Sequence, residues 1–94
     1  MTNFHAIQLL ITGQVQGVGY RRWFEKEALR LQLLGYVRNL PTGAVEAVII
    51  GQDSQLEEMI RHSYVGPLRA EVSSIQQHML DSLPAMTDFK ILRG

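Results

Sequence analysis

The sequence contains no cysteine, and that absence excludes several kinds of site at once. Without a thiol, the chain forms no disulfide bond, holds no metal through a thiolate and uses no cysteine as a nucleophile. The Gly-x-Ser-x-Gly segment that carries the nucleophile of many serine hydrolases is missing as well. His5, His62 and His78 are scattered and do not have the spacing of metal ligands. We therefore expect no metal site and no covalent intermediate on cysteine or serine.

The chain also lacks a net charge and a long apolar run. Its nine basic and nine acidic side chains balance, whereas broad nucleic-acid binding requires a basic face. No apolar stretch is long enough to cross a bilayer, and no basic segment precedes an apolar one as in a signal peptide. These absences make a cytoplasmic protein the default expectation, with neither nucleic acid nor membrane as a partner. A monomer is the default oligomeric state. With 94 residues, the chain is expected to form a single domain over residues 1–94.

What the chain does contain is a glycine-rich segment, residues 13–21, with the sequence GQVQGVGYR. Because glycine has no Cβ, such a loop can curl and direct several N–H groups toward one point, next to the positive end of a following helix. Arg21 adds a planar cation that can bind two phosphate oxygens at once, whereas Arg22, about 100° further round the helix, points elsewhere. The segment predicts a site for an oxyanion such as phosphate. The alternative is a tight turn in which Arg21 only pairs with Glu25.

Two stretches have the apolar periodicity of helices. The first begins near Tyr20, and we expect Gly35 to end it. The second is expected to begin with a capping box formed by Ser54 and Glu57, and to end at Gly66-Pro67. The apolar stripes are Tyr20, Phe24, Ala28 and Leu31 in the first helix, and Leu56, Met59, Ile60 and Tyr64 in the second.

Five other stretches have the composition and alternation of strands. We expect strands over residues 7–12, 35–40, 44–50, 71–77 and 87–92. The third is apolar on both faces, so it should lie at the centre of a sheet. The order of the elements predicts an α+β fold, the ferredoxin-like (split βαβ) plait with βαββαβ order and a short terminal strand. In this plait two helices pack on one face of a mixed, largely antiparallel sheet.

Asn39 stands near the end of one of these strands, where asparagine is uncommon. It can begin the turn made by Pro41-Thr42-Gly43, which is a frequent use of asparagine. It can also donate and accept hydrogen bonds beside the anion through its side-chain amide. The segment alone leaves both interpretations open.

At these two segments the chain resembles the acylphosphatase family. The family pattern Gly-x-Val-Gln-Gly-Val-x-Phe-Arg is matched from Gly13 to Arg21. A second pattern, Gly-aromatic-Val-basic-Asn-x-x-x-Gly-x-Val, is matched from Gly35 to Val45, and Gly51 corresponds to the glycine that closes it. The resemblance extends over the whole chain.

The resemblance implies hydrolysis of the carboxyl–phosphate bond of acyl phosphates, giving a carboxylate and orthophosphate without metal or cofactor. It implies that Arg21 and the amides of the loop hold the phosphoryl group, and that Asn39 orients the attacking water. Arginine stays charged and asparagine accepts no proton, so the simplest mechanism has no protein base. The phosphate-binding residues implied in this way are Gln16, Gly17, Val18, Gly19, Tyr20 and Arg21.

Two departures from the family pattern stand close to these residues. Tyr20 occupies a position where phenylalanine is usual, so its hydroxyl needs a partner. Leu40 follows Asn39, where many members of the family carry a small polar residue.

A different function on the same fold is a non-catalytic module that binds phosphate or carbamoyl phosphate, since similar domains occur fused in hydrogenase-maturation proteins. Turnover distinguishes this module from an enzyme, whereas phosphate binding does not. A further hypothesis is that the carboxylate of Gly94 pairs with Arg21.

Overall fold

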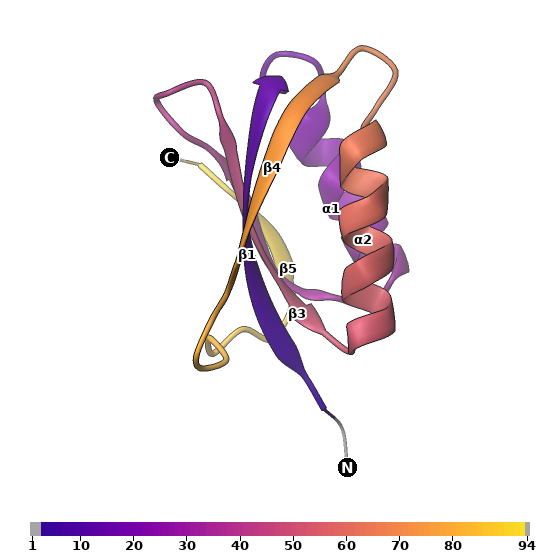
Figure 1. The fold of residues 1–94 in the computed structure, drawn as a ribbon, viewed down its shortest axis with the longest axis vertical. Coiled ribbons are helices and arrows are strands. Elements are labelled where there is room, and N and C mark those ends of the chain that lie inside the picture. Colours follow the sequence, from indigo (N-terminus) through magenta and orange to yellow (C-terminus); the bar gives the residue numbers. More distant parts are fainter. Residues whose placement is uncertain (1–2, 94) are drawn as a thin grey trace.

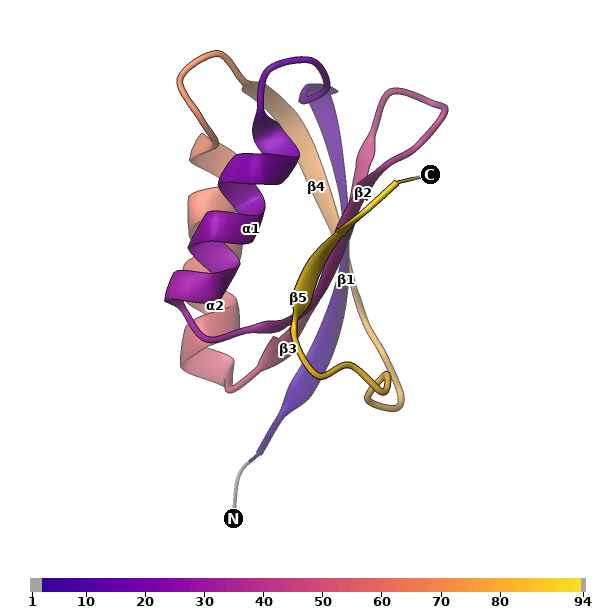
Figure 2. The ribbon, with the colours of Figure 1, turned by 180° about the vertical axis from the view of Figure 1, so that it is seen from behind.

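The computed structural model describes residues 3–93. Its five strands form one sheet in the order β4-β1-β3-β2-β5. The neighbouring strands are antiparallel except for β2 and β5, which are parallel. Both helices cover the same face of this sheet (Figures 1 and 2). The predicted ferredoxin-like plait is therefore confirmed. In chain order the elements are β1 (His5–Gln14), α1 (Tyr20–Arg30), β2 (Leu34–Asn39), β3 (Val45–Gly51), α2 (Asp53–Val65), β4 (Glu71–Met79) and β5 (Phe89–Leu92).

The predicted strands differ from the observed ones by no more than two residues at either end. Strand β3 lies in the middle of the sheet, and each of its seven residues is buried. One side of β3 belongs to the main core under the helices, and Val48 and Ile50 pack with Ala6 on the opposite side. The prediction of a central strand with two apolar faces is therefore confirmed.

The first helix ends through a left-handed residue that is not glycine. Gln32 has φ 61°, and its N–H donates to the Leu29 carbonyl at 3.0 Å. The Leu33 N–H donates to the Ala28 carbonyl at 2.9 Å. These two bonds form a Schellman motif, which normally has glycine at the left-handed position.

The prediction that Gly35 ends this helix is wrong, because Gly35 lies inside β2. Its φ is 132°, and a Cβ added there would overlap the carbonyl oxygen of Val48 in the neighbouring strand. This glycine is needed for the close approach of β2 to β3, not for a helix end.

The second helix begins two residues earlier than predicted. Its N-cap is Gln52, not Ser54, and its first residue is Asp53. The Gln52 N–H donates to Oε1 of Gln55 at 2.9 Å, so these glutamines, and not Ser54 and Glu57, form the reciprocal cap. The predicted cap was wrong because serine is a far commoner N-cap than glutamine.

The end of α2 at Gly66 is as predicted, but its buried stripe differs. Half of the Tyr64 surface is exposed, and Ser63 takes the buried position instead. Within residues 3–93, neither helix has the length and apolar character needed to cross a membrane.

Candidate active site

The loop between β1 and α1 has the backbone conformation that its glycines permit. Gly17 and Gly19 have φ values of 74° and 80°, which other residues rarely adopt. A Cβ added at either glycine would meet nothing within 4 Å, so the conformation and not the available space requires glycine. Gly19 is the N-cap of α1 and offers no side chain to accept from the first-turn N–H groups. These donors and the positive end of the helix dipole are therefore available to an anion.

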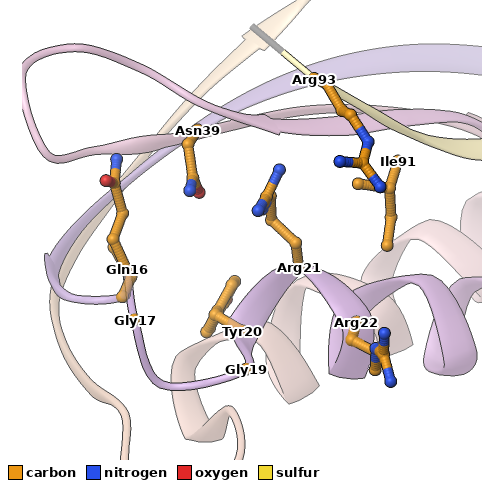
Figure 3. Close-up of a pocket in the computed structure, with 10 residues that line it drawn as sticks. Gln16, Gly17, Gly19, Tyr20, Arg21, Arg22, Asn39, Ile91 and Arg93 are labelled. Carbon is orange, nitrogen blue, oxygen red and sulfur yellow. The ribbon is translucent and has the colours of Figure 1, made fainter.

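Beside this loop lies a cavity of about 310 Å³. Its walls come from the loop, the first turn of α1 and the ends of β2 and β5 (Figure 3). The parallel pairing of β2 with β5 brings those two strand ends together. Of the residues that the structure describes, three arginines and no acidic side chain line the cavity, so its charge favours an anion. The lining residues are Val15, Gln16, Gly17, Gly19, Tyr20, Arg21, Arg22, Asn39, Ile91 and Arg93.

Arg21 directs its guanidinium toward the end of β2, into the space beside Asn39 (Figure 3). Its Nη1 donates a long hydrogen bond, 3.5 Å, to the carbonyl of Leu92. The alternative pairing with Glu25 does not occur among the ion pairs of residues 3–93. Arg22 borders the cavity, but its side chain points away from Arg21, as the helical geometry predicts (Figure 3).

Asn39 is the last residue of β2. The turn that follows is closed by a 3.1 Å bond from the Gly43 N–H to the Leu40 carbonyl, so the turn begins one residue later. The Asn39 Oδ1 atom is buried and has no hydrogen-bond partner within the described residues. The interpretation of Asn39 as a turn former is therefore wrong, and its amide remains available to a group bound in the cavity.

Gln16 links the glycine-rich loop to the hairpin between β2 and β3. Its Nε2 donates to the carbonyls of Leu40 and Ala44, each at 2.9 Å. Val18 differs from the other predicted phosphate-binding residues, because it does not line the cavity and its side chain packs against the core. The other predicted site residues, Gln16, Gly17, Gly19, Tyr20, Arg21 and Asn39, meet around the cavity.

The hydroxyl of Tyr20 has the partner that the sequence required. The side chain is buried, and Oη donates to the Ser63 carbonyl in α2 at 2.7 Å. In a continuing helix the Ser63 carbonyl would accept the N–H of residue 67, but Pro67 has none. Burial raises the pKa of the Tyr20 phenol well above its usual value, so the hydroxyl keeps its proton. This bond fixes the start of α1 on the end of α2.

Replacing Tyr20 with phenylalanine is expected to lower the free energy of unfolding by about 1–2 kcal/mol, because the Ser63 carbonyl loses its donor. Catalysis should be affected little, since the ring and the backbone at residue 20 remain. Urea unfolding followed by circular dichroism measures the change. An unfolding free energy equal to that of the unchanged protein would mean that another donor serves this carbonyl.

The sequence interpretation missed two residues that line the cavity, Ile91 in β5 and Arg93 just after it. Successive side chains of a strand point to opposite faces, so Phe89, Ile91 and Arg93 lie on the same side. The register pairs Val37 with Ile91, and the same register continued by two residues sets Arg93 beside Asn39. The parallel pairing of β2 with β5 was the missing information. The predicted contact of Gly94 with Arg21 lies outside the described residues.

Within residues 3–93, no group of three or more His, Cys, Asp or Glu side chains is arranged to hold a metal ion. His5 and His62 instead contact the carboxylates of Asp53 and Glu27, at 2.7 and 3.1 Å.

Comparison with known proteins identifies relatives of this chain. The family model described as Acylphosphatase matches residues 7–91. The chain is 41% identical over 87 residues to an acylphosphatase of Azorhizobium caulinodans, covering 93% of this chain and 94% of the relative. Its fold is similar to an acylphosphatase from Coxiella burnetii, with a TM-score of 0.91, 32% identity and coverage of 96% and 94%. It is also similar to 12% of full-length HypF in a phosphate- and nucleotide-bound form, with a TM-score of 0.86, 26% identity and 98% of this chain covered.

The matched range contains the glycine-rich loop, the first turn of α1 and Asn39, which together build most of the cavity. The similarity to the two acylphosphatases extends over nearly the whole length of both chains, in sequence and in fold. This chain therefore belongs to the acylphosphatase family.

Proposed function

We propose that the protein hydrolyses acyl phosphates to a carboxylate and orthophosphate in the cavity between the glycine-rich loop and Asn39. One observation carries the proposal. The Arg21 guanidinium, the uncapped start of α1 and the Asn39 side chain face the same cavity. Within residues 3–93, Oδ1 of Asn39 has no hydrogen-bond partner and no acidic side chain lines the cavity.

The phosphoryl group is the part of the substrate that this site is built to hold. N–H groups of the loop from Gln16 to Tyr20 bind its oxygens, and Arg21 contributes a forked pair of donors and a permanent positive charge. These groups are fixed before the substrate binds, because Gly19 sets the start of the helix and the buried ring of Tyr20 packs that start against the core. Preorganised donors stabilise the charge that develops during transfer without costing reorganisation in the reaction.

Asn39 orients the water that attacks phosphorus. Its Oδ1 accepts one hydrogen of the water, which directs an oxygen lone pair toward the phosphoryl group held by Arg21. As the new P–O bond forms, the bond from phosphorus to the acyl oxygen breaks. The water proton goes to a phosphoryl oxygen, because neither arginine nor asparagine accepts it. The departing carboxylate is a weak base and requires no acid.

The cavity offers fewer polar groups to the acyl part of the substrate than to the phosphoryl group. Ile91 adds an apolar wall at the β5 side of the cavity, and Arg93 adds positive charge there. Because the polar groups concentrate on the phosphoryl end, we expect the enzyme to accept a range of acyl groups.

We further propose that residues 1–94 form one acylphosphatase-like domain acting as a cytoplasmic monomer. Its partners in this proposal are a small acyl phosphate and the orthophosphate product, with no nucleic acid and no membrane. The equal numbers of basic and acidic side chains support a confined positive cavity over a broad basic surface.

Hydrolysis of benzoyl phosphate in the presence of EDTA tests the proposed reaction. We expect rapid release of benzoate and orthophosphate at a rate that EDTA leaves unchanged, because no step uses a metal. A rate that EDTA abolishes and a divalent cation restores would contradict the metal-free mechanism.

The second candidate is a module that binds phosphate or carbamoyl phosphate without turnover. The similarity to a segment of HypF, a protein solved with phosphate and nucleotide bound, supports only the binding of phosphate. The same assay distinguishes the two. Folded protein that binds orthophosphate in calorimetry but does not hydrolyse benzoyl phosphate would support the binding module.

A further inference from the structure

We infer that the side chain of Gln16 is a positioning residue, which holds Asn39 at the correct place relative to the phosphate-binding loop. The inference rests on the proposed function, in which the loop grips the phosphoryl group and Asn39 orients water. It concerns the side-chain amide of Gln16 and not its backbone N–H, which belongs to the loop.

The side-chain amide joins two segments that lie far apart in the sequence. Nε2 donates to the carbonyls of Leu40 and Ala44, both at 2.9 Å. Those two residues form the mouth of the β2–β3 hairpin, where the Leu40 N–H donates to the Ala44 carbonyl at 2.8 Å. Asn39 directly precedes this mouth, and it pairs with Val45 at the end of the ladder. Figure 3 shows the amide of Gln16 reaching the hairpin next to Asn39.

No other hydrogen bond within residues 3–93 joins the loop, residues 15–19, to the hairpin, residues 39–45. The Asn39 Oδ1 atom has no hydrogen-bond partner there that could fix the rotamer of the side chain. Its neighbour Leu40 has an apolar side chain that cannot supply one. The position of the Asn39 amide therefore depends on its backbone, and Gln16 anchors that backbone one residue further on.

Such an anchor affects the rate because in-line attack tolerates little displacement. A shift of about 1 Å between a water and the group it attacks can cost on the order of 10²-fold in rate. The anchor spans the two halves of the site, since the loop holds phosphorus and the hairpin carries Asn39. Losing it should leave each half intact and disturb the distance between them.

Substitution by methionine removes the amide and keeps the length and neutral charge of the side chain. The two carbonyls keep their backbone donors, the Gly43 N–H for Leu40 and the Leu40 N–H for Ala44, so folding should be preserved. We expect Gln16→Met to lower kcat for benzoyl phosphate by about 10–100-fold. The inhibition constant of orthophosphate should change by less than about threefold, because the loop N–H groups and Arg21 remain.

The matched control is Gln14→Met. Gln14 is an exposed glutamine two residues earlier that does not line the cavity, and the kcat of this variant should be unchanged.

A double-mutant cycle with Asn39→Ala tests whether Gln16 acts through Asn39. At raised enzyme concentration, Gln16→Met should lower the residual kcat of Asn39→Ala by less than about threefold, since the amide it positions is gone. An equal loss in both backgrounds overturns the inference, as does a loss of orthophosphate affinity with kcat unchanged. If Asn39→Ala alone keeps normal turnover, the proposed role of Asn39 is wrong and the inference fails with it. If Asn39→Ala is inactive but Gln16→Met is fully active, only the inference fails.

Discussion

Replacing Asn39 with alanine is expected to lower kcat by at least about 10²–10³-fold, the usual cost of removing one preorganised polar group from a reacting centre. The loss should fall on kcat because the amide acts on water, and the binding of orthophosphate does not require that water. Since Arg21 and the loop N–H groups remain, the orthophosphate inhibition constant should change by less than about threefold. Steady-state hydrolysis of benzoyl phosphate, with orthophosphate as a competitive inhibitor, measures both quantities.

The same substitution should not destabilise the fold. The Asn39 Oδ1 is buried and has no partner among residues 3–93, so alanine removes no hydrogen bond to this atom and relieves the cost of an unpaired buried acceptor. We therefore expect a melting temperature equal to or above that of the unchanged protein, which separates lost catalysis from lost structure. Gln14→Ala, at an exposed position that does not line the cavity, is the control and should keep its rate. Near-normal turnover of Asn39→Ala would mean that the water is positioned by another group.

The parts of the fold that depend on local periodicity could be predicted from the sequence. Alternating and helical patterns identify all seven elements, and the doubly apolar stretch 44–50 correctly indicates the central strand. The conformation of the glycine-rich loop also agrees with its sequence, because Gly17 and Gly19 take the positive φ values that glycine permits.

The errors concern interactions between distant segments. Gly35 has the spacing of a helix-ending glycine, but its role is set by the close approach of β2 to Val48 in β3. The residues next to Gly35 in the sequence do not indicate this contact. Gln32 takes the left-handed position because the helix must turn before β2 begins, and this overrides the preference for glycine. Arg93 reaches the cavity only because β5 pairs with β2 in parallel. The pairing of two distant strands produces no pattern of apolar residues within either strand, so it cannot be predicted from one segment.

The site itself combines both kinds of information. Its loop and the first turn of α1 are contiguous in sequence, and the anion binding that we propose for them follows from glycine and arginine chemistry. Asn39 joins them through the sheet, where β3 lies between β1 and β2 and sets their spacing. The Gln16 side chain then crosses from loop to hairpin. The resemblance of the two motifs to the acylphosphatase family predicts that the loop and Asn39 meet. The Gln16 side-chain contact that links the loop to the hairpin is visible only in the structure.

Replacing Arg21 with alanine is expected to have the largest effect, a loss of at least about 10³-fold in kcat/KM, because an arginine that stabilises phosphoryl transfer contributes about 10³–10⁵-fold in rate. Unlike the change at Asn39, this one should also weaken orthophosphate inhibition strongly, since Arg21 contacts the phosphoryl group before and during the reaction. Arg21→Lys keeps the charge but loses the planar fork, so it should recover little of the rate. Benzoyl phosphate kinetics and orthophosphate inhibition measure the three forms.

Arg22→Ala is the matched control for this prediction. Arg22 borders the same cavity and carries the same charge, but its side chain points away from Arg21 and Asn39 (Figure 3). If the direction of the guanidinium determines catalysis, Arg22→Ala should retain kcat/KM within about threefold. If the total positive charge of the cavity determines it, both alanine variants should lose activity to a similar degree, and Arg21→Lys should be nearly as active as the unchanged protein. The second pattern would contradict bidentate binding by Arg21 and reduce its role to electrostatic attraction, which rising ionic strength would screen equally at both positions.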